Sequence, residues 1–203
     1  MARKQAADYA KRRDAIVEKA ARLYAEHGFL GASIADLARS CNTSKSLIYH
    51  YYPSKEDILF DVMHSHVSTL LDAAERIAAT PADPHDKLRM LTREFMKHYV
   101  GAAARQKVLL NELGRLPAAR RAIIIGIQRR LVGLVEVLLA ELRPELGGQS
   151  PLHWPAAMLY FGMINWTLTW MSASGPAKPA HIADLAAEIY LQGIGKAAIP
   201  RQD

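Results

Sequence analysis

Residues 33–59 read SIADLARSCNTSKSLIYHYYPSKEDIL, and they contain two short helical patterns that are separated by a tight turn. Ser33 and Asp36 have the Ser-x-x-acid spacing of a capping box, so we expect a helix to begin near Ser33. This helix should end near Cys41, because Asn42 tolerates the left-handed backbone of a tight turn. A new helix should follow at once, and the stretch is therefore predicted to be a helix-turn-helix.

The second helix of this motif is expected from about Ser44 to Tyr51, because the side-chain oxygen of Ser44 can cap a new N-terminus. Ile48 and Tyr52 share the face that turns toward the core. The outer face carries small, basic, hydroxylated and aromatic side chains, namely Lys45, Ser46, Tyr49 and His50. Groups of these kinds make hydrogen bonds and ion pairs to phosphates and base edges, so this face is predicted to enter a DNA groove.

A third helix should begin after Pro53, where Ser54 and Asp57 repeat the capping-box spacing. From Lys55 the apolar positions keep a helical period until Thr80, after which prolines follow. A helix of about 25 residues is near 38 Å long at about 1.5 Å per residue. It can connect two modules rigidly, so we expect the domain boundary inside this helix and not in a flexible linker.

The order of residues in this motif resembles that of the TetR family of bacterial transcriptional repressors. In that family the DNA-binding segment carries I-A-x-x-A, a turn, and then S-x-G-x-x-Y-x-x-F-x-x-K-E-x-L. The residues of this chain that match the pattern are Ile34, Ala35, Ser44, Tyr49, Lys55, Glu56 and Leu59. Three positions depart from it: Asn42 and Ser46 stand where the family usually has Gly, and Tyr52 stands where it usually has Phe. The match extends back through ARLYAEHGFLGAS and covers roughly the first 60 residues.

The resemblance implies an all-α protein of about nine helices. An N-terminal three-helix DNA-binding domain with the helix-turn-helix is expected over residues 1–56, and a C-terminal helical ligand-binding and dimerisation domain over residues 57–203. Helical spacing of apolar residues predicts the remaining helices over residues 9–27, 84–102, 105–113, 118–142, 151–172 and 179–195. Gly28 should terminate the first of them.

Double-stranded DNA is the expected partner of the first domain. Lys45, Ser46 and Leu47 should face base edges, where Leu47 can touch a thymine methyl group. The other side chains expected at DNA, mainly at phosphates, are Ser33, Thr43, Ser44, Tyr49, His50, Tyr51 and Lys55. A dimer would present two such helices about 34 to 36 Å apart, so the operator should be a palindrome.

Composition agrees with this interpretation. The 203 residues are half apolar, which allows a sizeable core, and the net charge of +6 fits a polyanionic partner. Residues 1–13 carry five basic residues and one acidic residue, which suits an arm that contacts phosphates. The single cysteine, Cys41, excludes an internal disulfide and is expected to pack as a small residue more than to act as a redox sensor. The chain shows no signal-peptide pattern, so we expect a cytoplasmic protein.

The stretch 151–172, PLHWPAAMLYFGMINWTLTWMS, is apolar on nearly all sides, which requires burial on more than one side. A membrane span is the alternative, but the run from Ala156 to Met171 is 16 residues long and falls short of the ~20 that a bilayer needs. We therefore expect no membrane association. Together with the last helix, this stretch should form half of the four-helix bundle of a homodimer.

TetR-like regulators generally hold a small molecule among their middle helices, and this is implied here by the resemblance alone. Candidates for the lining are polar or aromatic residues in otherwise apolar helical stretches: Tyr99, Asn111, Gln128, Tyr160, Asn165, Trp166 and Trp170. The phrase FGMINWTLTW, with the helix that follows it, is more loosely similar to regulators that respond to acyl-CoA thioesters. Alternative hypotheses are a regulator of efflux or stress genes with an aromatic or drug-like ligand, and a regulator without an effector.

An enzyme on a helical scaffold is the least supported class. The sequence contains no Gly-rich phosphate loop, no HExxH, no paired Glu-x-x-His and no G-x-S-x-G. His64 and His66 are two residues apart and point to different faces of a helix, so they do not predict a metal pair. We expect no catalytic residues, no metal site and no cofactor.

Overall fold

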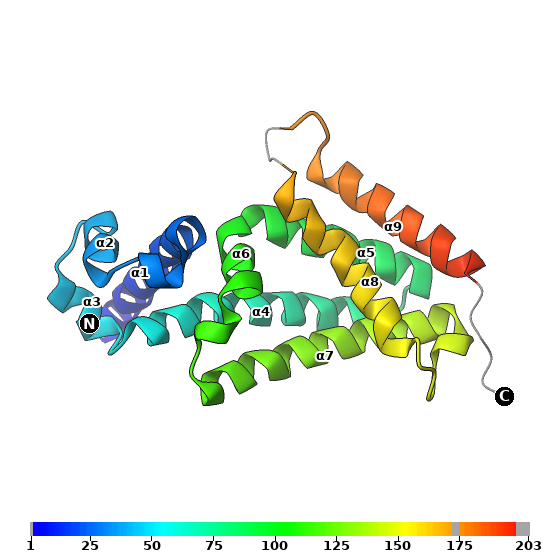
Figure 1. Cartoon of the computed structure of the whole chain (residues 1–203), viewed down its shortest axis with the longest axis horizontal. Helices are drawn as coiled ribbons and strands as arrows, with labels where there is room; N and C mark the ends of the chain where they lie inside the picture. The colour runs from blue at the N-terminus through cyan, green and yellow to red at the C-terminus, as the bar shows by residue number, and fades with distance from the viewer. Residues whose placement is uncertain (1, 172–174, 198–203) are drawn as a thin grey trace. The chain divides into compact units, whose positions relative to one another are not determined.

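The computed structural model describes residues 2–171 and 175–197, with side chains from residue 8 onward. Within these ranges the chain forms α-helices, short 3-10 turns and loops, and no strand, so the predicted all-α class is confirmed (Figure 1). The α-helices are α1 (Ala2–Gly31), α2 (Ile34–Ser40), α3 (Lys45–Tyr51), α4 (Lys55–Ala78), α5 (Pro84–Gly101), α6 (Ala103–Asn111), α7 (Ala118–Leu142), α8 (His153–Trp166) and α9 (Pro179–Lys196).

The chain packs as two compact units. The first unit comprises residues 1–67 and 104–125, and the second comprises residues 68–103 and 126–203. Helices α4 and α7 each run from one unit into the other. Compact packing therefore assigns α6 and the start of α7 to the unit that contains α1, α2 and α3, whereas the functional boundary after residue 56 stays a prediction.

Helix α1 is longer than predicted and bends where the sequence suggested an end. It runs from Ala2 to Gly31, and Gly28 has φ +72° and ψ 162° inside it. Only glycine adopts this backbone readily, because a side chain would clash with its own main chain. A Cβ at position 28 would in addition lie 3.3 Å from Oε1 of Glu112.

The predicted helix-turn-helix is confirmed, including the residues that cap its two helices. Ser33 Oγ accepts a hydrogen bond from the Asp36 amide at 3.1 Å, and the Asp36 carboxylate accepts one from the Ser33 amide at 3.0 Å. Asn42 has φ +50°, as the tight turn requires. Ser44 Oγ then accepts a hydrogen bond from the amide of Leu47 at 3.1 Å and caps α3.

The predicted cap of α4 and the predicted burial of two core residues are also confirmed. Ser54 Oγ accepts a hydrogen bond from the Asp57 amide at 3.1 Å at the start of α4. Ile48 and Tyr52 are buried, as their shared helix face predicted. They join a core in which the largest apolar members include Ile16, Tyr24, Phe29, Leu37, Ile58, Leu59 and Met63.

In the second unit α5 lies beside α9, and the core contains Leu88, Phe95, Tyr99, Leu139 and Tyr160. The expected bounds of α5, α7 and α9 are met within one residue at each end.

The helix expected over residues 151–172 is shorter, because α8 ends at Trp166 and a 3-10 turn, Thr167–Thr169, follows. The Thr167 hydroxyl donates to the carbonyl of Ile164 at 2.6 Å and the Thr169 hydroxyl to that of Trp166 at 2.7 Å. Side chains that bond the preceding carbonyls in this way compete with the helical ladder. Residue 172 lies outside the described residues.

Candidate functional site

The first turn of α3 presents unengaged side chains. Lys45 and Ser46 are exposed, and within the described part of the chain neither makes a side-chain hydrogen bond or an ion pair. Leu47 is half-buried beside them. A lysine that is not used for packing or pairing is available for an external partner, and its position at the start of a helix-turn-helix recognition helix suits contact with base edges.

The other predicted DNA contacts surround this turn. Ser33 and Ser44 are exposed at the N-termini of α2 and α3, where each side chain also serves as the cap. Thr43 is half-buried in the turn between the helices. The hydroxyl groups of Ser33 and Ser44 therefore cap the two helices, and both side chains stay exposed to an external partner.

The aromatic side chains at the end of α3 form a small cluster. Tyr49 is 51% exposed. The rings of His50 and Tyr51 lie edge to face with centroids 5.3 Å apart. Tyr51 also packs on Tyr9 of α1, at 4.6 Å between centroids, and this contact fixes its orientation.

A cleft of about 430 Å³ separates α1 from the turn and α3. Arg12 and Lys19 from α1 line it opposite Thr43, Leu47 and Tyr51. Arg12 belongs to the basic stretch of residues 1–13 that was expected to contact phosphates, whereas Lys19 was not predicted as a site residue. Lys19 lies seven positions after Arg12 on the same helix face, and this spacing could have identified it.

Cys41 lies in the same cleft and is half-buried. Burial raises the pKa of its thiol, although Ser40 and Lys19 act in the opposite direction. A thiol with a raised pKa holds less of the reactive thiolate. The environment of Cys41 is therefore that of a packing residue.

Lys55 differs from Lys45 because its ammonium group turns inward. It donates a hydrogen bond to the carbonyl of Phe29 and lies 4.1 Å from the centroid of the Phe29 ring. Burial lowers the pKa of Lys55, while Glu56 and Glu112 act against that shift. An ammonium group has three donors, so the bond to Phe29 leaves two for a phosphate, and that contact stays a prediction.

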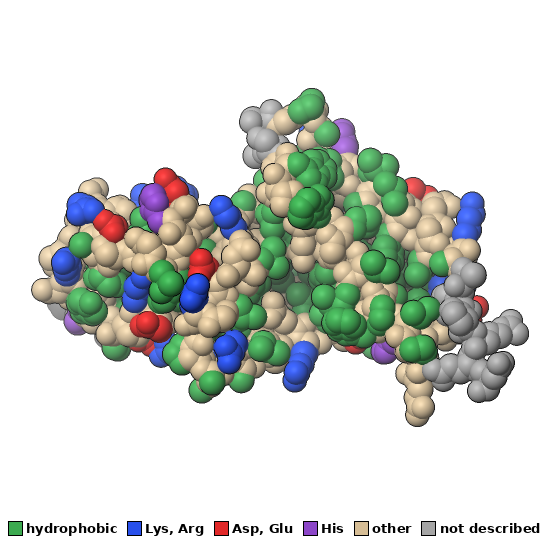
Figure 2. Space-filling view, in the orientation of Figure 1, with side chains coloured by type: hydrophobic (Ala, Val, Ile, Leu, Met, Phe, Trp, Pro, Cys, Tyr) green, Lys and Arg blue, Asp and Glu red, His purple; other side chains and the backbone are tan. Residues whose placement is uncertain are grey.

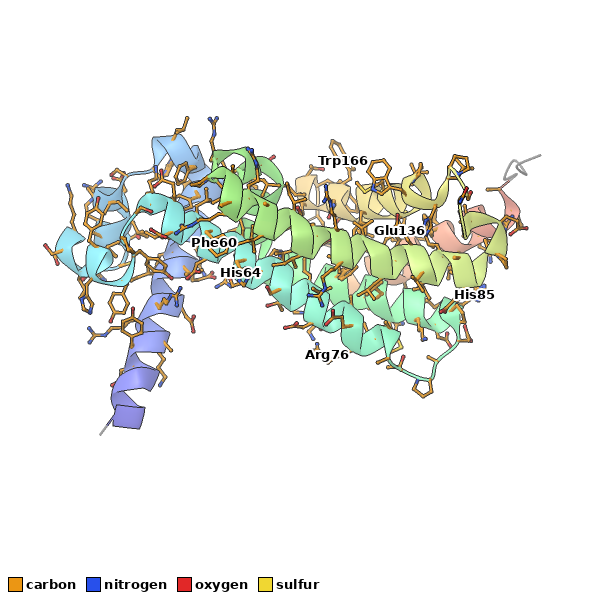
Figure 3. All side chains as sticks on the ribbon, turned by 90° about the horizontal axis from the view of Figure 1, so that it is seen from below. Phe60, His64, Arg76, His85, Glu136 and Trp166 are labelled. Atoms are coloured by element: carbon orange, nitrogen blue, oxygen red, sulfur yellow. The ribbon has the colours of Figure 1, made fainter. Side chains whose placement is uncertain are left out.

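The seven predicted effector contacts do not form one group. Asn111 belongs to the first unit, is exposed, and donates its side-chain amide to the Lys107 carbonyl at 3.0 Å. Trp166 and Trp170 are 67% and 58% exposed. Figure 3 shows Trp166 projecting outward from α8. Neither tryptophan lines the interior of the second unit.

Tyr99 and Tyr160 do lie in that interior. The Tyr160 hydroxyl is 3.0 Å from the Thr92 hydroxyl, and burial raises the pKa of Tyr160. Tyr99 stacks on Phe95 at 6.3 Å between centroids. Gln128 and Asn165 are half-buried in the same unit. A separate apolar cavity of about 120 Å³ lies among α4, α5 and α7, and Lys87 and Glu141 are among its lining residues.

Helices α8 and α9 expose large apolar side chains (Figure 2). The exposed residues of α8 and the turn after it are Trp154, Met158, Leu159, Trp166 and Trp170, and those of α9 are Leu185 and Ile189. A groove of about 370 Å³ runs between the two helices and is lined by Leu159, Met163, Ile189 and Ile194 among others. Apolar surface of this extent marks an interaction site in most proteins.

Two features are absent from the described residues. Histidines, cysteines and carboxylates nowhere gather in the groups of three or more that could hold a metal ion. None of the helices there is both long enough and apolar enough to cross a membrane.

Comparison with protein families gives two matches. Residues 16–62 match the family described as bacterial regulatory proteins, tetR family, and residues 81–194 match the tetracyclin repressor-like, C-terminal domain. Among curated relatives, the HTH-type transcriptional regulator BetI of Rhizobium meliloti (strain 1021) is 29% identical over 194 residues, which are 94% of this chain and 95% of that protein.

Two solved structures extend the comparison. A TetR-family transcriptional regulator from Bordetella parapertussis 12822 is 36% identical with a TM-score of 0.85, covering 88% of this chain and 93% of that one. AibR, solved in complex with isovaleryl coenzyme A and operator DNA, is 25% identical with a TM-score of 0.77, covering 88% of this chain and 97% of that one.

Proposed function

Because the chain belongs to the TetR family of DNA-binding transcriptional repressors, we propose that it binds a palindromic operator as a homodimer and leaves it when an acyl-CoA thioester binds. The observation that carries the DNA part of the proposal is the unpaired, exposed start of α3. Lys45 and Ser46 have no intramolecular partner among the described residues and stand where a recognition helix reads bases.

The proposed DNA contacts fall into two groups. Lys45, Ser46 and Leu47 read base edges, and this group determines which sequence is preferred. The contacts that position the protein on phosphates are Ser33, Thr43, Ser44, Tyr49, His50, Tyr51 and Lys55. Arg12 and Lys19 join the second group because they line the cleft beside α3.

The dimer is proposed to form through α8 and α9. The apolar side chains exposed on these helices would be buried against the same face of a second copy, as a two-fold interface requires. The exposure of Trp166 and Trp170 fits this interface better than an interior cavity. Such a dimer carries two α3 helices and so accounts for a palindromic operator.

The effector is proposed to bind in the second unit, where Tyr99, Gln128, Tyr160 and Asn165 offer polar groups among apolar side chains. The similarity to AibR, whose structure contains isovaleryl coenzyme A, supports the acyl-CoA class. Tyr99 and Tyr160 are tightly packed, so an acyl chain would have to displace core side chains in order to enter.

The test has two stages. Selection from a random duplex pool gives the preferred operator, which we expect to contain two inverted half-sites. Fluorescence anisotropy of the labelled operator then follows release during titration with acyl-CoA thioesters of increasing chain length, with free coenzyme A as the control. Release by none of the thioesters would remove the acyl-CoA assignment, and release by an aromatic compound would replace it.

A further inference from the structure

The bend of α1 is held through the backbone N–H and C=O of Phe29. The amide of Phe29 donates a hydrogen bond to Oε1 of Glu112 at 3.2 Å. The carbonyl of Phe29 accepts a hydrogen bond from Nζ of Lys55. All three residues belong to the first compact unit, and Glu112 directly follows α6. The backbone N–H and C=O of Phe29, the residue next to Gly28, are therefore both fixed by side chains from distant parts of the sequence.

Each of these side chains is itself constrained. The Glu112 side chain is only 17% exposed, and its second oxygen lies 3.7 Å from Nε of Arg115. The Lys55 ammonium lies over the buried rings of Phe29 and Tyr24, at 4.1 and 5.9 Å from their centroids. Neither group can turn away without loss of a second interaction.

The bend decides where the helix-turn-helix begins. Ser33, which caps α2, lies five positions after Gly28, and α2 leads through the turn into α3. The capping bonds between Ser33 and Asp36 fix only the local backbone of α2. The direction in which the chain leaves α1 depends on the peptide that follows Gly28, because the bend occurs there.

Other contacts between α6, α7 and the rest of this unit act elsewhere. Arg105 lies 3.3 Å from the carboxylate of Glu18 and 3.3 Å from the hydroxyl of Ser65. Arg120 pairs with Asp57 at the start of α4. These bonds attach side chains to side chains along α1 and α4, whereas Glu112 bonds the backbone at the bend itself.

We infer that Glu112 is a positioning residue for DNA recognition: from the end of α6 its carboxylate holds the bend at Gly28 and Phe29 and thereby places α3 for base contact. The inference rests on the proposed function, since it concerns the geometry with which α3 meets DNA.

The test compares Glu112→Ala with Glu112→Gln and Glu26→Gln in the full-length protein. Alanine removes the acceptor of the Phe29 amide, whereas glutamine keeps a side-chain oxygen that can accept this hydrogen bond. Glu26 is a glutamate of α1 whose side chain is 74% exposed and lies 3.7 Å from Nε2 of His27. The measured quantity is the ratio of affinities for the selected operator and for an unrelated duplex of equal length. A loss of folded protein lowers both affinities equally and leaves this ratio unchanged.

For Glu112→Ala we expect the ratio to fall roughly tenfold, because an unsatisfied amide at the bend lets α3 leave its reading position. Glu112→Gln should recover most of the ratio, and Glu26→Gln should match the wild type. Hydrogen exchange at the Phe29 amide should accelerate in the alanine variant alone.

A ratio within twofold of wild type in Glu112→Ala overturns the inference, as does a glutamine variant that is as impaired as the alanine variant. If Glu112→Ala does not fold, Glu112→Asp replaces it, because the shorter side chain withdraws the carboxylate from the Phe29 amide and should lower the ratio in the same direction. Wild-type protein without any operator preference rejects the proposed function itself. An operator preference that every variant retains rejects only the role of Glu112.

Discussion

The Nε of Arg13 in α1 donates a hydrogen bond to the hydroxyl of Tyr52, the residue that follows α3, at 3.1 Å. The same hydroxyl donates to Asp61 of α4 at 2.8 Å, and Arg13 pairs with that carboxylate at 2.5 Å. Tyr52 therefore connects α1, the end of α3 and α4 in the first compact unit. Arg13, which the sequence analysis placed in a phosphate-contacting arm, is therefore paired with other residues of the chain.

Tyr52→Phe should lower the free energy of unfolding by about 1 kcal/mol, because it removes two hydrogen bonds to charged groups and keeps the buried ring. The figure is modest because the Arg13 side chain is 47% exposed and can still pair with Asp61. Urea unfolding followed by circular dichroism measures the change. Tyr49→Phe is the matched control, since the exposed Tyr49 hydroxyl has no partner in the described residues, and an equal loss in both variants would contradict the role of the network.

The parts of this unit that could be predicted from sequence depend on residues close together in the chain. Ser33 and Asp36 are three positions apart, and so are Ser54 and Asp57, so each cap is visible in a short window. The contact between Phe29 and Glu112 spans 83 positions and leaves no local pattern. The inward direction of Lys55 could not be predicted for the same reason, because its partner Phe29 is 26 positions away.

The second unit shows a different limit. A helix that is apolar on all sides, as α8 is, gives no periodicity that separates an inner face from an outer one. Tyr160 and Trp166 were therefore both expected beside an effector, yet Tyr160 is buried in the core and Trp166 is exposed. Which aromatic residues of α8 face inward depends on how α5 and α9 pack against α8, and no local sequence pattern predicts that packing.

Lys45→Ala should weaken binding to the selected operator by about 1 to 3 kcal/mol and leave binding to an unrelated duplex nearly unchanged, because a base contact carries discrimination. Anisotropy titrations with both duplexes at one salt concentration measure the two affinities. Lys107→Ala, which alters an exposed lysine of α6, serves as the charge-matched control. Equal weakening on both duplexes would reassign Lys45 to phosphate contact.

Lys55→Ala should lower both the free energy of unfolding and the salt dependence of DNA binding. Loss of the bond to the Phe29 carbonyl should lower the free energy of unfolding by about 1 to 2 kcal/mol. Loss of a phosphate contact should reduce the slope of log affinity against log salt by about one unit. Titrations at four salt concentrations give the slope. A destabilised variant with an unchanged slope would restrict Lys55 to its structural role.

Asp184→Asn should destabilise the protein in a pH-dependent way. A hydrogen bond from Arg93 of α5, and then its charge, hold the pKa of Asp184 in α9 below its usual value. A carboxyl with a depressed folded pKa contributes stability above its unfolded pKa of about 3.9, and this stability is lost as the pH falls through the folded pKa. The Tm of the variant should therefore lie below that of wild type at pH 7, by a small amount because the pair is exposed.

Thermal unfolding by circular dichroism at pH 7 and at successive values below about pH 4 tests this window, and the difference in Tm should shrink as the pH falls. Asp72→Asn, at an exposed carboxylate of α4 without an ion pair in the described residues, is the control. A Tm difference that stays constant across the whole pH range would show that the substitution acts through packing and not through the charge of Asp184.

Leu159→Glu should convert the proposed dimer to a monomer without unfolding the second unit. Leu159 is 71% exposed on α8, so a charge there costs little in the isolated chain but would be buried in a dimer interface. Val137→Glu places the same charge at an exposed apolar position of α7, where Val137 is 58% exposed, and should leave the dimer intact. Sedimentation velocity over a range of concentrations distinguishes the two states. The monomer should also lose operator affinity, because one α3 then binds without the other, and a Leu159→Glu variant that remains dimeric would place the interface on another surface.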